Sequence, residues 1–238
     1  MLLKYSVDNL ELNMFPSEEC ISDDRFLMEI DTVIGKMKVL KRACILEDTK
    51  TSFLTSISCA IDCIKGNAQS QTSFKLNKIT SFQFLIYVDK QVYNYGFSCD
   101  KSYVHEEWLA ILNSSGKFDL LFDKHKQSRF LLPELSNISS HAHAVLSWLE
   151  RMHFVKKAAF IENDSNDIII ANKISYDDFN DLTNCQFIFT TKDSKFLNLE
   201  KIDKDGIWFH RNEHFYPLSD YSVKKGQNIQ KDYLAGRF

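Results

Sequence analysis

The stretch that most constrains the fold of this chain is an apolar run, a polar turn and an amphipathic segment in series over residues 41–64. Ala43 to Leu46 form a short apolar run that predicts a buried strand. After the turn, apolar residues recur at the three- and four-residue spacing of one buried helix face: Phe53, Leu54, Ile57, Ala60, Ile61 and Ile64. Strand, loop and helix in this order are the setting of a phosphate-binding P-loop.

The loop itself lacks the residues that this chemistry needs. A P-loop has the pattern Gly-x-x-x-x-Gly-Lys-Ser/Thr, because its backbone N–H groups must curl around phosphate in conformations that side chains obstruct. Lys50 and Thr51 match the end of the pattern, but Cys44 and Thr49 occupy the two glycine positions. Two acidic residues also precede Thr49, and they would repel phosphate. We therefore expect a degenerate site that binds no nucleotide.

Composition indicates an ordinary globular protein. Of the 238 residues, 44% are hydrophobic and 26% are charged, while glycine (7) and proline (3) are scarce. This balance argues against disorder and collagen-like repeats. The net charge of -3 offers no general electrostatic reason to bind nucleic acid, so nucleic acid remains a partner without support from charge.

Cysteine usage and the apolar runs bear on location. Six cysteines are scattered along the chain, and Cys59 and Cys63, four apart on the predicted helix, have no second pair to complete a zinc site. We expect reduced thiols in a cytoplasmic protein. No apolar run reaches the length of a signal peptide or a membrane span, so we expect no membrane partner.

The first half of the chain has the pattern of strands. Residues 2–7 and 26–34 are expected to be strands, with a polar loop over 13–24. Residues 82–88 and 91–99 predict a hairpin that turns at 89–90. Two further strands, at 103–112 and 118–122 with a turn at 114–116, would extend the hairpin to a four-stranded antiparallel meander. Its aromatic residues suit the core of a half-buried sheet.

The second half is expected to be helical and then α/β. A helical pattern covers 128–152, and short apolar runs at 158–161, 186–189 and 206–209 suit buried parallel strands. A strand at 215–218 and a helix at 228–234 end the chain. Because no linker divides it, we predict a single domain over 1–238, with a β-rich half (1–127) and an α/β half (128–238).

Several segments resemble prokaryotic AAA/ATP-binding-cassette-type ATPases of the RecF/SMC/OLD-like group. The opening strand (residues 1–9), the hairpin around Tyr93-Asn-Tyr-Gly-Phe97, the strand and loop at 187–193, and the C-terminal end from 206 to 237 carry the resemblance. It is weak between about 128 and 185. The resemblance implies an α/β fold: a trimmed ATP-binding-cassette-like domain in which a mixed sheet with flanking helices accompanies an antiparallel β-meander.

The departures from the family are more informative than the matches. Its acidic motif ends a strand with Asp-Glu, which hold Mg²⁺ and polarise the attacking water; here Glu162 and Asn163 follow the predicted strand, and an amide is no general base. The switch-loop histidine aligns with Lys192. The nearest match to the Ser-Gly-rich signature loop, at 139–141, lacks its glycine. Together with the P-loop, these losses imply a pseudo-ATPase with no catalytic residue, cofactor or metal.

We therefore expect a catalytically inactive ATPase-like protein that acts by protein–protein binding in a prokaryotic DNA-linked or antiviral defence system. The expected partner is a full-length ATPase, a nuclease or a second copy of the chain. Because no nucleotide would be bound, the contact with this partner would have to come from apolar surface of the protein itself. The aromatic meander (82–122) and the aromatic C-terminal segment (208–238) are the candidates.

The alternative is a metal-dependent nuclease or hydrolase that uses carboxylates with His141/His143 or His210/His214. His141 and His143 are two apart on a predicted helix, so they should point to different faces. His210 and His214 flank a glutamate, but not in the His-Glu-x-x-His spacing of zinc proteases. Both pairs are therefore weak candidates for a metal site.

Overall fold

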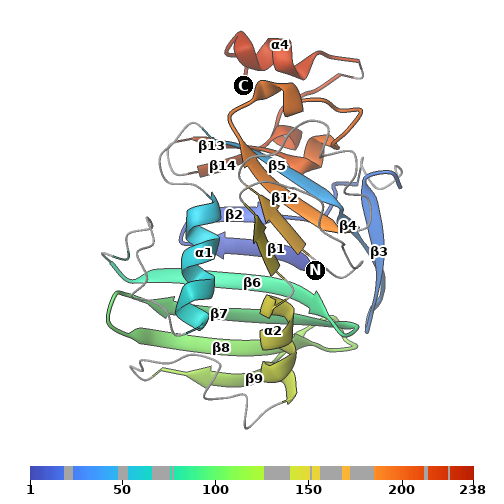
Figure 1. Ribbon diagram of the computed structural model, residues 1–238. Helices are drawn as coiled ribbons and strands as arrows, with labels where there is room; N and C mark the ends of the chain where they lie inside the picture. Colours follow the sequence, from blue (N-terminus) through green and yellow to red (C-terminus); the bar gives the residue numbers. More distant parts are fainter. Residues whose placement is uncertain are drawn as a thin grey trace. The chain divides into compact units, whose positions relative to one another are not determined.

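The computed structural model describes residues 1–18, 24–47, 53–65, 76, 78–125, 140–150, 152–155, 168–171, 185–211, 214–224 and 226–238. The chain forms two compact units, each assembled from separate segments. The first unit comprises Met1–Asn13, Ile30–Met37 and Phe53–Arg151, and the second comprises Met14–Glu29, Lys38–Ser52 and Met152–Phe238. Helices and a mixed set of strands confirm the α/β class at this coarse level (Figure 1).

The first unit is built on a six-stranded antiparallel sheet in the order β2-β1-β6-β7-β8-β9. Its strands are β1 (Leu2–Val7), β2 (Leu10–Asn13), β6 (Thr80–Val88), β7 (Gln91–Cys99), β8 (Val104–Leu112) and β9 (Phe118–Lys124). The predicted meander is confirmed. Asp89 and Lys90 make the β6–β7 turn with φ of 51° and 62°. Two left-handed residues match the twist of a two-residue hairpin, even without glycine.

Two helices, α1 (Phe53–Ile64) and α2 (Ser140–Glu150), pack on one face of this sheet. Tyr5 of β1 contacts Phe53 of α1 and Phe84 of β6, and Phe84 contacts Trp148 of α2. Every second residue of β6 from Thr80 to Val88 is buried on that face. The antiparallel sheet therefore buries its apolar side against the helices, as the period-two pattern requires.

The predicted buried face of α1 is largely correct. Ile57 and Ile61 are buried. Leu54, which the spacing also assigned to that face, is only half-buried, and Ser56, Cys59 and Cys63 are buried in addition to the predicted set.

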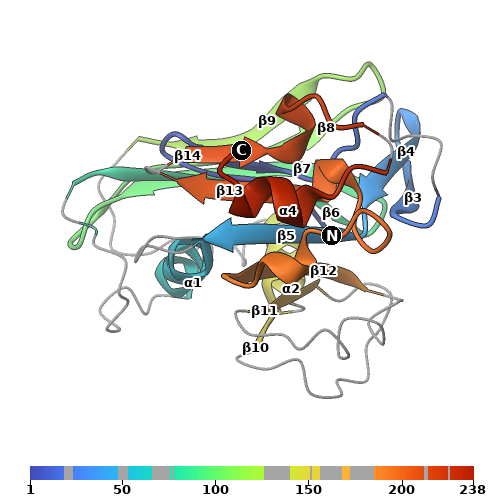
Figure 2. The same cartoon turned by 90° about the horizontal axis from the view of Figure 1, so that it is seen from above.

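The second unit is built on a mixed sheet in the order β10-β11-β12-β5-β13-β14 (Figure 2). Its strands are β5 (Arg42–Glu47), β10 (Met152–Val155), β11 (Ile168–Ala171), β12 (Gln186–Thr191), β13 (Ile207–Arg211) and β14 (His214–Pro217). The first five in sheet order are parallel, and β14 is antiparallel to β13. The predicted parallel strands at 186–189 and 206–209 are confirmed.

One core cluster of the second unit joins this sheet to the segments after β12 and β14. Phe187, Phe189, Phe196 and Phe209 are its largest members, and Ile229 of α4 (Ile229–Leu234) joins them. Three short 3-10 turns, η2 (Ser194–Phe196), η3 (Lys204–Gly206) and η4 (Leu218–Asp220), complete the unit.

The aromatic C-terminal segment is mostly packed inward. Phe209 stacks on Tyr233 and Phe238, with ring centroids 5.5 and 5.9 Å apart. Tyr221 meets Phe209 and Phe238 edge to face. Most of the aromatic character of this segment therefore serves the core of the second unit.

The structure corrects several predicted boundaries. The strand expected over 26–34 is β3 (Leu27–Thr32), which turns at 33–34 into β4 (Gly35–Leu40) to form a two-stranded sheet. The expected loop over 13–24 overlaps the end of β2. The helix expected to reach Met152 ends at Glu150, and Met152 begins β10.

Four strands were not predicted: β2, β4, β10 and β11. Residues 126–139, which hold the start of the predicted helix, and the predicted strand at 158–161 lie outside the described residues. Among the residues that are described, no helix is both long and apolar enough to cross a membrane.

Candidate functional site

The strand and helix that flank the degenerate P-loop are both present. β5 ends at Glu47 and α1 begins at Phe53, as predicted. Lys50 and Thr51 fall between them, outside the described residues.

The remaining degenerate positions are widely separated in the chain. Glu162 and Asn163 also lie outside the described residues. Lys192 is described: it directly follows β12 and its side chain is exposed. The described part of the chain thus places one of the five candidate positions.

The carboxyl ends of the parallel strands hold a buried pair that sequence reasoning missed. β5 lies between β12 and β13, so the rising strand order of the sheet breaks at β5. In open parallel sheets, ligands bind outside the carboxyl ends of strands at such a break. The register pairs Glu47 at the end of β5 with His210 of β13.

Glu47 and His210 have the chemistry of a functional site, but their side chains are too far apart to hydrogen-bond to each other. Glu47 Oε1 and His210 Nδ1 are 3.8 Å apart, and the two residues are 8% and 2% exposed. The distance allows an ion pair when the imidazole is protonated, but it exceeds hydrogen-bond length. The ring of Phe215 meets that of His210 edge to face, at 4.8 Å. Buried carboxylate–imidazole pairs recur among general acids and bases.

The structure does not bring His210 and His214 together. On the β13–β14 ladder His210 pairs with Phe215, and Arg211 pairs with His214. Adjacent rungs of a ladder present side chains on opposite faces. His210 is buried on one face and His214 is exposed on the other.

His141 and His143 are also apart. His141 Nδ1 lies 2.9 Å from the hydroxyl oxygen of Tyr93, and the two rings are in contact. His143, two residues further along α2, is exposed. In the described parts of the chain, no group of three or more His, Cys, Asp or Glu side chains is arranged to hold a metal ion.

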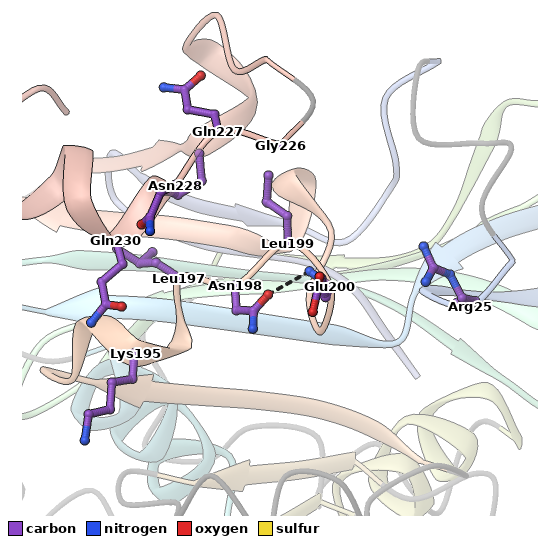
Figure 3. A pocket seen from close by; sticks show the side chains of 11 residues that line it. Arg25, Lys195, Leu197, Asn198, Leu199, Glu200, Gly226, Gln227, Asn228 and Gln230 are labelled. Carbon is purple, nitrogen blue, oxygen red and sulfur yellow. Dashed lines mark hydrogen bonds between the residues drawn. The ribbon is translucent and has the colours of Figure 1, made fainter.

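A cleft of about 660 Å³ lies in the second unit, between the turn after η2 and the start of α4 (Figure 3). This volume is within the range of small-molecule sites. The polar side chains on its wall are mainly amides and charged groups: Arg25, Lys195, Asn198, Glu200, Gln227, Asn228 and Gln230.

Hydrogen bonds within the chain already use several of these amides. Asn198 Oδ1 accepts from the backbone N–H of Glu200, the bond dashed in Figure 3. Gln227 Oε1 accepts from the N–H of Lys224, and Asn228 caps α4. The amides therefore shape the turns of the cleft, and their oxygens are engaged before any ligand arrives.

Exposed apolar side chains gather on β9. Phe118, Leu120 and Leu121 are 42%, 60% and 37% exposed. Within the described residues β9 pairs with β8 alone, so it is an edge strand. Of the described residues in the C-terminal segment, only Tyr216 and Leu234 are large, apolar and exposed. Of the two candidate surfaces, the meander is therefore the one with several exposed apolar side chains on a single strand.

A register shift shapes this edge. Leu109 pairs with Phe122 and Ala110 pairs with Leu120, which places Leu121 in a β-bulge. Bulges at sheet edges discourage the addition of further strands. The edge is therefore better suited to contacts through side chains than to extension of the sheet.

No protein-family model matches the chain, and no curated protein matches it.

Proposed function

We propose that this chain is a catalytically inactive, ATPase-like protein that acts by binding a protein partner through β9. The exposed Phe118, Leu120 and Leu121 on this strand carry the proposal. Several exposed apolar side chains on one edge strand are costly to leave in water, and protein–protein contacts are the usual reason for retaining them.

The inactive-ATPase part rests on the loop after β5. A central parallel strand followed in the chain by a helix supports a trimmed ATP-binding-cassette-like domain. The chain has no glycine between Gly35 and Gly66. Without glycine, the loop has no favourable way to turn successive N–H groups toward a phosphate.

The partner is a full-length ATPase, a nuclease or a second copy of this chain, within a prokaryotic DNA-linked or antiviral defence system. The resemblance to the RecF/SMC/OLD-like group supports this choice. ATPases of that type dimerise around nucleotide, so a chain without the nucleotide motifs needs contacts that work without it. We accordingly propose association that is independent of ATP.

Sedimentation velocity of the full chain, alone and with the ATPase or nuclease encoded beside it, tests the proposal. We expect a complex in one of these mixtures, with an affinity that ATP–Mg²⁺ does not change. Leu120→Asp should weaken that affinity at least about tenfold, because a charge would replace buried apolar contact. Leu234→Asp is the matched control, since Leu234 is at least as exposed as Leu120 (70% against 60%) but lies in the second unit. A strict monomer in every mixture would contradict the proposal, as would equal effects of the two substitutions.

A further inference from the structure

Three cysteines gather inside the first unit. Cys59 and Cys63 lie on α1, and Cys99 ends β7. The sulfur atoms of Cys63 and Cys99 are 3.9 Å apart, and Cys59 hydrogen-bonds to Cys63. All three thiols are buried, and Cys63, at 7%, is the most exposed of them. The fold thus brings into contact two thiols that are 36 positions apart in the sequence.

The Cys63–Cys99 pair differs from the Cys59–Cys63 pair in one important way. Cys59 and Cys63 share one turn of a single helix, whose backbone fixes their separation. Cys63 and Cys99 come from different elements, a helix and a strand. A disulfide requires the sulfur atoms, now 3.9 Å apart, to approach to about 2.05 Å, so at least one of the two side chains must turn toward the other.

We propose that Cys63 and Cys99 are an oxidation site, at which a peroxide converts the thiol pair to a disulfide that fixes α1 to β7. Cys63 reacts first because it is the more exposed of the two. Its thiolate attacks a peroxide oxygen, the O–O bond breaks, and a sulfenic acid and one water result. The Cys99 thiolate then attacks that sulfur, the S–O bond breaks, and a second water leaves. Two electrons and two protons pass from the thiols to the peroxide.

The surroundings make this reaction slow at neutral pH. The hydrogen bond from Cys59 lowers the pKa of Cys63, but the hydrogen bond with Cys99 and burial outweigh it and raise that pKa to about 12. Asp62 on α1 adds to the rise. Tyr95, whose hydroxyl donates to Glu107, interacts electrostatically with both thiols, and Tyr5 of β1 interacts electrostatically with Cys63. Only a small fraction of Cys63 is therefore thiolate, the reactive form.

The disulfide would have a measurable effect on stability. It would close a loop that contains β6 and β7, and so remove conformational freedom from the unfolded chain. Because the two sulfurs already touch in the reduced fold, little native packing has to change. We expect the oxidised protein to unfold several degrees higher than the reduced protein.

Treatment of the folded full chain with hydrogen peroxide tests the proposal. We expect an intact mass lower by two hydrogen atoms, a Cys63–Cys99 cross-link in the peptide map, and a higher Tm that dithiothreitol reverses. The initial rate should rise about tenfold per pH unit between pH 7 and 9, because the thiolate fraction does so below the pKa.

Two substitutions separate this pair from the other cysteines. Cys99→Ala should abolish the mass loss and the rise in Tm, whereas Cys44→Ala, at a buried cysteine of the second unit, should leave both intact. The peptide map is made on the unaltered chain, so this part of the test holds even if a variant fails to fold. Any other pairing, further oxidation of Cys63 to sulfinic acid without a cross-link, or no reaction in the folded state would overturn the proposal.

Discussion

The hydroxyl of Tyr5 is enclosed in the core of the first unit. It donates to Ser56 Oγ at 3.2 Å, while its ring lies against Phe53 and Phe84. Burial raises the pKa of Tyr5 well above its usual value, with the hydrogen bond to Ser56 opposing the rise. The folded state therefore holds this proton at pH values where the unfolded chain releases it.

We expect this proton to make stability fall with pH under alkaline conditions. The stabilisation is complete below about pH 10, the ordinary tyrosine pKa, and is lost as pH rises toward the folded-state value. In Tyr5→Phe, the free energy of unfolding should fall less steeply above about pH 10, as urea titrations at several pH values would measure. Tyr103→Phe, at an exposed tyrosine, is the control. Identical slopes in the two variants would contradict the assignment.

A second prediction concerns α1. Ile57 is fully buried, whereas Leu54, one turn earlier, is half-buried. Ile57→Ala should lower the free energy of unfolding by about 2–5 kcal/mol, because it removes apolar contacts and leaves a cavity. Leu54→Ala should cost clearly less, since water already reaches that side chain. Equal losses in urea titrations would show that the helix face is misassigned.

At the scale of elements, long periodic segments could be predicted, whereas several short strands could not. α1 and the meander strands repeat their pattern over seven residues or more. β10 and β11 have four residues each, and their stability comes from neighbours along the parallel sheet. In β4, Lys36 and Lys38 alternate with neutral residues and weaken the apolar signal.

The candidate site was harder to predict for a related reason. Glu47 and His210 lie close together only because β5 pairs with β13, and neither local sequence predicts that pairing. His210 and His214 are four residues apart, the spacing that would place them on one face of a helix. In a hairpin the register decides on which face each side chain lies, and here it places them on opposite faces. Helical spacing is therefore informative only where the segment is a helix.

Gly96 of β7 gives an element-scale prediction. It pairs with Trp108 of β8, and an added Cβ would lie 2.1 Å from the Trp108 ring atom Cζ2. The indole therefore lies across the glycine, a known way to protect a weak position in a sheet. Gly96→Ala should destabilise the protein by about 1–3 kcal/mol, because the ring must move.

A double-mutant cycle with Trp108→Ala tests this interpretation. If the clash is with the indole, the two substitutions together should cost less than the sum of their separate costs, by at least about 0.5 kcal/mol. Chemical denaturation of the four proteins supplies the free energies. Strict additivity would mean that the cost at Gly96 arises elsewhere in the strand.

At the scale of the whole molecule, the chain passes repeatedly between its two units. β5, from the first quarter of the sequence, is completed by β12 and β13 from the last quarter. The sheet of the second unit therefore depends on closing a long loop that contains most of the first unit. Such interleaving leaves no linker in the sequence, so the two units could not be predicted from composition.

The last prediction concerns nucleotide and the stability of the whole chain. A ligand that binds only the folded state raises the free energy of unfolding by RT ln(1 + [L]/Kd), which is about 4 kcal/mol at a thousand times Kd. Millimolar ATP–Mg²⁺ would thus raise Tm by several degrees if Kd were micromolar. We expect no rise, because the glycine-free loop between β5 and α1 offers no nest of N–H donors, and Glu47 and Asp48 repel phosphate. Calorimetric titration provides the independent measurement. A micromolar Kd there, or a reproducible rise in Tm, would show that the chain retains a nucleotide site.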